Sequence, residues 1–104
     1  MILELPVRNR DRTLDLAYAN LTAPIARRIE RMRRRARMSR HDLAVRIDST
    51  DGFIARLETG GSAITAERVR KVARALRIRE ELLYPYGRPD LFWSRVDYDL
   101  ERYV

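Results

Sequence analysis

Apolar residues recur at helical spacing through the middle of the chain, and this periodicity limits the possible folds more than any other feature. Steps of three and four residues place such side chains on one face of an α-helix. The first stripe consists of Ile25, Ile29, Met32 and Ala36, and the last of Val69, Val72, Ala73 and Leu76. We therefore predict a mainly α domain whose first helix begins at Thr22 as N-cap, with Pro24 in its first turn.

Between these stripes, capping and turn residues divide the chain into short helices. Ser39 and Asp42 have the spacing of a capping box, and the triplet Asp48-Ser49-Thr50 interrupts the helix that they begin. The threonine of that triplet can cap a third helix, which ends near Gly60. Thr65 can cap a fourth. The pattern predicts two short helices joined by a three-residue turn and followed by a longer helix.

The two ends of the chain show the period-2 alternation that is typical of strands. The alternating apolar residues are Leu3, Leu5 and Val7 at one end, and Val96, Tyr98 and Leu100 at the other. Either end could form a strand, and together they could form a small β ribbon. Residues 13–21 are compatible with a strand or a helix, and a brief fifth helix is expected over residues 79–84, because Pro85 disfavours helical angles in the residue before it.

These boundaries predict one domain with two short arms. We expect an N-terminal arm over residues 1–21, a helical domain over residues 22–84 and a C-terminal arm over residues 85–104. A monomer has little reason to expose as much apolar surface as the aromatic run Leu91-Phe92-Trp93 in the last segment. We therefore expect this arm either to fold back on the Leu3-Leu5-Val7 segment or to serve as a dimerisation segment against a second copy.

Charge and composition narrow the function. The formal net charge is +7, and nine arginines against two acids lie between residues 25 and 47. This excess favours a polyanionic partner such as nucleic acid, although the same arginines could form a solvated helix face. The chain has no cysteine and one histidine, His41, so we expect no metal site, no cofactor and no enzymatic role. Without a membrane-length apolar run or a basic leader, a soluble cytoplasmic protein is expected.

Residues 40–59 meet the packing demands of a helix-turn-helix. This motif needs apolar residues wherever its two helices meet the core, and a small residue where they cross closely. Leu43, Ala44 and Ile47 meet this need in the first helix, and Ile54 and Leu57 meet it in the second. The same five positions are also compatible with an ordinary helical hairpin.

The stretch from Ile25 to Leu83 resembles the Cro/C1-type (XRE-like) helix-turn-helix family. The resemblance lies in four runs, Ile29 to Arg33, Met38 to Ala44, Ile54 to Gly60 and Val69 to Leu76. It implies a five-helix, lambda-repressor-like domain with short terminal arms. In that family the positions of Arg33 and Glu58 form an ion pair between the first helix and the recognition helix. Arg33 lies on the apolar stripe, which favours this structural pair over a phosphate contact.

The resemblance also implies which residues meet DNA. The helix from Thr50 to Thr59 would enter the major groove, with its first residues at base edges. Carried over by position, Asp51, Gly52 and Arg56 would face bases, Phe53 would lie at the groove wall or half-buried, and Arg40 would contact phosphate. The sequence departs from the family at Asp48, which replaces a glycine, and at Asp51-Gly52, which replaces a polar pair. Asp can adopt a left-handed conformation, and a carboxylate can accept from cytosine N4 or cap its own helix.

From these features we predict a sequence-specific DNA-binding transcriptional regulator, a repressor, that binds double-stranded DNA as a homodimer. The alternative is a protein-interaction module on the same fold, such as an antitoxin-like or polymerase-binding adaptor. In that case Asp48, Asp51 and Phe53 would meet a basic protein partner. The fold alone does not decide between the two, because function lies in the site.

Overall fold

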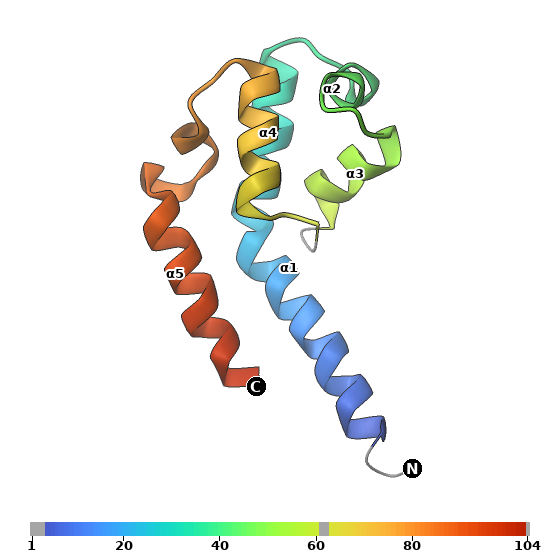
Figure 1. Cartoon of the computed structure of the whole chain (residues 1–104), viewed down its shortest axis with the longest axis vertical. Helices are drawn as coiled ribbons and strands as arrows, with labels where there is room; N and C mark the ends of the chain where they lie inside the picture. Colours follow the sequence, from blue (N-terminus) through green and yellow to red (C-terminus); the bar gives the residue numbers. More distant parts are fainter. Residues whose placement is uncertain (1–3, 61–62, 104) are drawn as a thin grey trace.

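A long first helix organises the molecule, and shorter helices pack on either side of it (Figure 1). The computed structural model describes residues 4–60 and 63–103, with side chains for residues 12–60 and 63–102. In these ranges no residue belongs to a strand, which confirms the mainly α fold. The elements are α1 (Glu4–Arg35), α2 (Arg40–Arg46), α3 (Asp51–Thr59), α4 (Ala66–Leu76), the 3₁₀ helices η1 (Glu80–Leu83) and η2 (Pro85–Gly87), α5 (Pro89–Leu100) and the 3₁₀ helix η3 (Glu101–Tyr103).

The sequence predicted that the first helix begins at Thr22, and this prediction is wrong. α1 already starts at Glu4, so Pro24 lies inside it, and the expected strand at Leu5 and Val7 is helical. Leu3 lies outside the described residues. The alternation at this end coincides with a helical series, because Leu14, Tyr18 and Leu21 also follow at steps of four and three. The helical series extends over more residues than the alternation, and this end of the chain forms a helix.

Thr22 serves the interior of α1 rather than its end. Its side chain is fully buried, and its hydroxyl donates to the carbonyl of Tyr18 at 2.8 Å. This bond to the residue four positions back satisfies a hydroxyl that burial would otherwise leave unpaired. Pro24 has no N–H to offer the carbonyl of Asn20, but Asn20 is exposed, so water can hydrate that carbonyl.

The caps predicted for the short helices are all present. Ser39 accepts from the backbone of Asp42 while the Asp42 carboxylate accepts from the Ser39 backbone, which completes the capping box and lowers the pKa of Asp42. Thr50 and Thr65 cap α3 and α4 through their hydroxyls. Asp48 adopts the expected left-handed conformation, with φ of 55°. Local side-chain chemistry therefore sets these helix ends.

The C-terminal segment is a helix and not the expected strand. α5 begins at Pro89, a favourable first residue, and contains Val96, Tyr98 and Leu100. Its buried positions follow helical steps, because Phe92 and Trp93 precede the buried Val96 by one turn and pack against the core. Since both ends are helical, no β ribbon forms in the described residues.

Aromatic side chains join α5 to the rest of the bundle. Trp93 donates from Nε1 to the hydroxyl of Tyr84 at 2.7 Å, and edge-to-face contacts link Tyr84, Phe92 and Trp93. The brief helix predicted over residues 79–84 is the 3₁₀ helix η1, and it ends before Pro85 as expected. Burial raises the pKa of Tyr84 despite the bond from Trp93.

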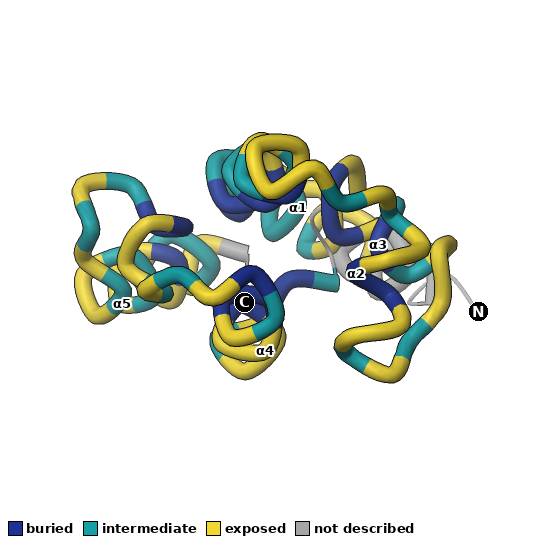
Figure 2. Tube along the Cα trace, turned by 90° about the horizontal axis from the view of Figure 1, so that it is seen from above, coloured by how far each residue is buried: buried dark blue, intermediate teal, exposed yellow. Residues whose placement is uncertain are grey.

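The core lies between α1, α3 and α4. Buried positions occupy the inner sides of α1 and α4 in the view from above (Figure 2). The predicted α4 stripe is buried throughout, and Tyr18 donates its hydroxyl to the carbonyl of Ile64, which ties α1 to the start of α4. No helix within the described ranges is long and apolar enough to cross a bilayer.

Candidate DNA-binding site

α3 turns one face to the core and the opposite face to solvent. Ile54 and Leu57 are fully buried, and Glu58 is 5% exposed. Asp51, Gly52 and Arg56 are exposed on the other side of the same helix, and Thr50 at its N-cap is exposed as well. The residues that the family resemblance assigned to base edges thus share the solvent-facing side of α3.

The carboxylate of Glu58 holds α3 against α1 from behind. Arg33 donates to it from Nε at 2.6 Å and from Nη2 at 3.0 Å, and Nη1 of the same side chain donates to the Met38 carbonyl at 2.8 Å. The pair expected from the family spacing is therefore present, in the bidentate geometry that suits a guanidinium. It fixes the recognition helix relative to α1 and to the loop before α2.

The charge of Glu58 is maintained by its partners. Burial alone would raise the pKa of Glu58, but the hydrogen bonds and charges of Arg33 and Arg40 lower it below the usual value of a glutamate. The hydrogen bond to Glu58 raises the pKa of Arg33 in turn. Both partners are therefore charged at neutral pH.

Arg40 has a role that the sequence did not predict. Its Nε donates to Glu58 at 3.0 Å, and its side chain is 39% exposed. Arg40 thus joins the buried network through one nitrogen. Its terminal nitrogens have no partner among the described residues and lie at the first turn of α2. The guanidinium is positioned by Glu58 while its outer N–H groups remain free for an acceptor.

Phe53 lies beneath two guanidinium groups. The Cζ atom of Arg68 is 5.0 Å from the ring centroid and that of Arg56 is 5.6 Å away, both within the range of a cation–π contact. Phe53 is half-buried and packs against the core. Arg68 belongs to the first turn of α4 and also donates to the Ala63 carbonyl. The sequence gave no signal for this contact, because Arg68 is fifteen positions from Phe53.

The acid at the start of α3 has a partner on α2. The Nδ1 atom of His41 lies 3.1 Å from Oδ1 of Asp51, and both side chains are exposed. Sequence reasoning treated His41 as an isolated surface residue. This contact links the start of α3 to α2 at Asp51, where the sequence departs from the family pattern. Asp48 has no ion-pair partner in the described residues.

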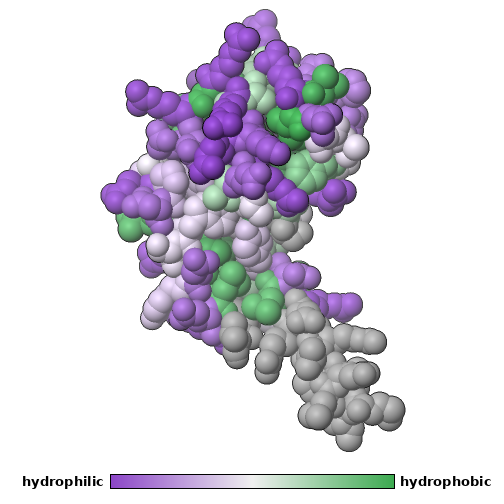
Figure 3. Space-filling view, viewed as in Figure 1, coloured by the Kyte–Doolittle hydropathy of each residue, from purple (hydrophilic) through white to green (hydrophobic). Residues whose placement is uncertain are grey.

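Gly52 has open space around it. A Cβ built at this position meets no atom within 4 Å, so packing inside the chain does not require glycine here. Hydrophilic side chains dominate the surface above, which is formed by α2, α4 and the C-terminal end of α1 (Figure 3). An exposed glycine on a helix lets another molecule approach its backbone closely.

Comparison with known protein families agrees with this geometry. A family model described as helix-turn-helix matches residues 29–83, which is more than half of the chain. The chain belongs to this XRE-type helix-turn-helix family. The matched segment runs from the second half of α1 to the end of η1 and contains Arg33, α3 and Glu58.

The family is one of DNA-binding domains of transcription regulators, and it is not typically enzymatic. Neither the curated proteins nor the solved structures contain a match to the chain. Within residues 4–60 and 63–103, no group of three acidic or histidine side chains is placed to hold a metal ion.

Proposed function

We propose that this protein is a sequence-specific DNA-binding transcription regulator that acts as a repressor. In this proposal α3 enters the major groove and reads base edges with Asp51, Gly52 and Arg56. The observation that carries the proposal is the two-sided construction of α3. Its rear is fixed by the buried network around Glu58, while its exposed side carries these three residues.

The residues around α3 divide between reading and positioning. Arg40 contacts a phosphate with its terminal nitrogens, since Glu58 already orients its guanidinium. Arg56 reads a base, and the Phe53 ring supports it from below. Arg68 lies over the same ring and adds positive charge beside α3. His41 contacts Asp51 on the same surface.

The protein-interaction alternative depends on an acidic surface at Asp48, Asp51 and Phe53. Two contacts weaken it. Asp51 lies against His41, and Phe53 is covered by Arg56 and Arg68. The aromatic part of the surface offered to a basic partner is therefore covered by two arginines. This favours DNA over a basic protein.

The proposal includes a homodimer, because two copies of α3 would then read two half-sites of a palindromic operator. Helix-turn-helix dimers place their recognition helices one DNA turn, about 34 Å, or whole multiples of it apart. The operator should accordingly be a two-fold repeat with a spacing near 10 base pairs or a multiple of it.

The experiment that tests this function is selection from a random duplex pool, followed by mobility shifts with competitor DNA. We expect one sequence class to be enriched and to survive competitor at physiological salt. Arg40→Ala should weaken all duplexes alike and lower the salt slope by about 1. Arg79→Ala, which removes an exposed arginine at the N-cap of η1, is the matched control and should bind as the parent does. If no sequence is enriched, the interaction-module alternative replaces the proposal.

A further inference from the structure

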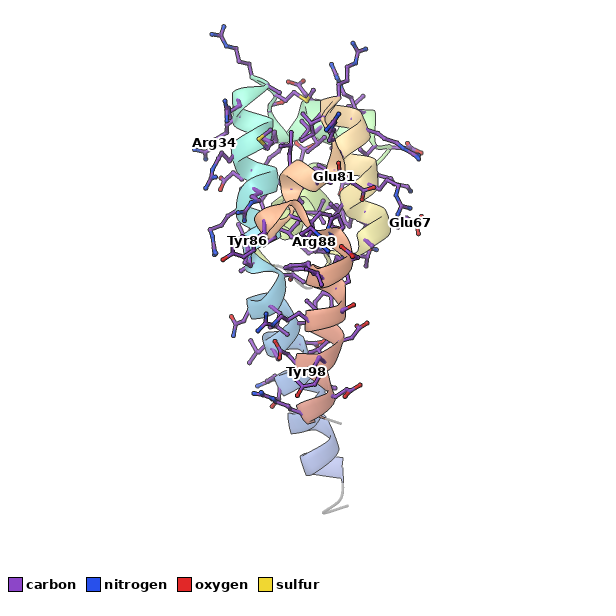
Figure 4. All side chains as sticks on the ribbon, turned by 90° about the vertical axis from the view of Figure 1, so that its left-hand side faces the viewer. Arg34, Glu67, Glu81, Tyr86, Arg88 and Tyr98 are labelled. Carbon is purple, nitrogen blue, oxygen red and sulfur yellow. The ribbon has the colours of Figure 1, made fainter. Side chains whose placement is uncertain are left out.

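Most of the large apolar side chains left in solvent lie in one part of the molecule. Six such residues are more than half exposed in the described ranges, and four of them belong to α1, η2 and α5. These four are Leu16, Tyr86, Leu91 and Tyr98. Figure 4 labels Tyr86 and Tyr98 on the α5 side of the bundle, which faces the viewer. Exposed apolar surface beside a groove is typical of a contact site.

A groove opens between α1 and α5, and two of these residues, Tyr86 and Leu91, belong to its lining. It has a volume of about 530 Å³, and its apolar lining comes from Leu21 of α1, Pro85 of η2, and Leu91, Phe92 and Val96 of α5. Arg88 and Arg95 stand at its edge. We call this cavity the α5 groove. It is large enough to accept an aromatic side chain.

Tyr86 stands at the rim of the α5 groove in an unusual conformation. It is 97% exposed, and its φ of 57° lies in the left-handed region, as does that of Gly87. A bulky residue seldom adopts this region, and such strained positions gather where a protein makes contact with a partner. No contact inside the chain accounts for a tyrosine held this way, since almost all of its surface faces solvent.

We propose that a second copy of this chain docks on this face, with Tyr86 of each copy inserted into the α5 groove of the other. A two-fold dimer needs one surface that is complementary to itself. Here the projecting side chain and the groove that fits it lie on the same face. This inference rests on the homodimer in the proposed function and gives it a location and an anchor residue.

Charge on α5 supports a second copy as the occupant. The helix carries both signs on exposed residues, with Arg95 and Asp97 lacking ion-pair partners among the described residues. Two copies of α5 that cross around a two-fold axis can place bases of one helix near acids of the other. A strongly acidic or strongly basic partner would leave one of these sets unpaired.

The docking face leaves the DNA-binding site open. α5 lies on the opposite side of the bundle from α2 and α3 (Figure 1). The dimer therefore exposes both recognition helices. It also covers the apolar residues that the chain does not bury itself.

The test is the dimer dissociation constant of the full chain without DNA, measured by analytical ultracentrifugation over a concentration series. We expect the parent to dimerise and Tyr86→Ala to raise the dissociation constant at least tenfold, as an interface anchor does. Leu91→Arg should be monomeric. Leu82→Arg is the matched control, because both leucines are 54% exposed but Leu82 lies outside the groove, and it should dimerise as the parent does.

The absence of cysteine permits a direct second measurement. A Tyr86→Cys protein mixed with an Arg95→Cys protein should form a covalent heterodimer with a short thiol cross-linker. Tyr86→Cys mixed with Leu82→Cys should not. Circular dichroism checks that each variant is folded.

Three results would overturn the proposal. These are a monomeric parent at all concentrations, dimerisation of Tyr86→Ala and Leu91→Arg with the parent's constant, and equal cross-linking of both mixtures. A parent that stays monomeric while the α5 groove binds a small amphipathic anion counts as the first of these results. Loss of sequence preference in an intact dimer would contradict the proposed function alone. A monomer that still recognises a single half-site would contradict this inference and the proposed homodimer, but it would leave sequence reading by α3 intact.

Discussion

At α3 the buried carboxylate of Glu58 meets two arginines, and the large apolar residues point into the core. At α5, by contrast, Leu91 and Tyr98 are more than half exposed, and Leu91 lines an open groove. Both helices lie against α1. The difference shows that α3 buries its large aliphatic residues within the chain, whereas α5 leaves large apolar residues in solvent, where the proposed dimer would cover them.

The two sides also differ in what fixes their geometry. α3 is positioned by hydrogen bonds from two charged side chains, Arg33 and Arg40, whereas α5 is attached by the aromatic contacts of Phe92 and Trp93 and one neutral hydrogen bond from Trp93 to Tyr84. A DNA-reading helix needs a fixed orientation, because base contacts depend on the positions of single atoms. Apolar contacts are less directional and suit a surface that packs against a partner.

Removal of the buried carboxylate of Glu58 should destabilise the packing of α3 against α1. Glu58→Ala leaves Arg33 buried without a negatively charged partner, so we expect the free energy of unfolding to fall by about 3 to 5 kcal/mol. Urea denaturation monitored by circular dichroism measures this. Arg34→Ala breaks the exposed pair with Glu30 and should change stability by less than about 0.5 kcal/mol. Equal effects of the two substitutions would show that the buried pair does not secure α3.

DNA binding should separate reading from folding. Arg56→Ala removes an exposed side chain on α3 and should cost about 1 to 3 kcal/mol on the preferred site, with little effect on other duplexes. Its stability should stay close to that of the parent, because Arg56 belongs to no ion pair among the described residues. Fluorescence anisotropy on preferred and scrambled duplexes provides the comparison. A uniform loss on both duplexes would assign Arg56 to the phosphates instead.

Acid should weaken the α3 side first. The folded state lowers the pKa of Glu58, so its contribution to stability is complete above the unfolded pKa, about 4.3, and is lost as the pH falls through the folded value. The free energy of unfolding should therefore fall more steeply below pH 4.3 in the parent than in Glu58→Gln. Urea denaturation at several acidic pH values measures the two slopes. Parallel slopes would mean that Glu58 does not titrate with folding.

The smallest expected effect is that of a substitution at Gly52, on the exposed side of α3. Alanine has room there and favours a helix, so Gly52→Ala should stabilise the protein by up to about 1 kcal/mol. If the backbone at Gly52 approaches DNA, the added methyl group should weaken binding while stability rises. Thermal melts and anisotropy on one preparation give both values. Unchanged affinity would place Gly52 away from the DNA.

The helix-turn-helix was predictable because its signals are local. Ser39, Thr50 and Thr65 cap helices within a few residues of themselves, and Arg33 lies on an apolar stripe that is visible in the sequence. The ends were not predictable in this way. The alternation at Val96, Tyr98 and Leu100 has the period of a strand, and only packing against Tyr84 selects the helix.

The contacts that sequence reasoning missed join residues far apart in the chain. Arg40 reaches Glu58, His41 reaches Asp51, and Arg68 reaches Phe53. Arg40, His41 and Arg68 could equally have faced solvent, and the adjacent sequence does not indicate which distant residue each one contacts. The tertiary fold brings them together, and the charge balance around α3 depends on it.

The proposal that α3 reads DNA sequence is tested by the ratio of the affinities for a preferred and a scrambled duplex. The dissociation constants of the parent are measured at physiological salt for the duplex enriched from the random pool and for a scrambled duplex of equal length. We expect the protein to bind the enriched duplex at least about 10³-fold more tightly than the scrambled one, as sequence-specific DNA-binding proteins do. A ratio near one, with both affinities vanishing as salt rises, would contradict it.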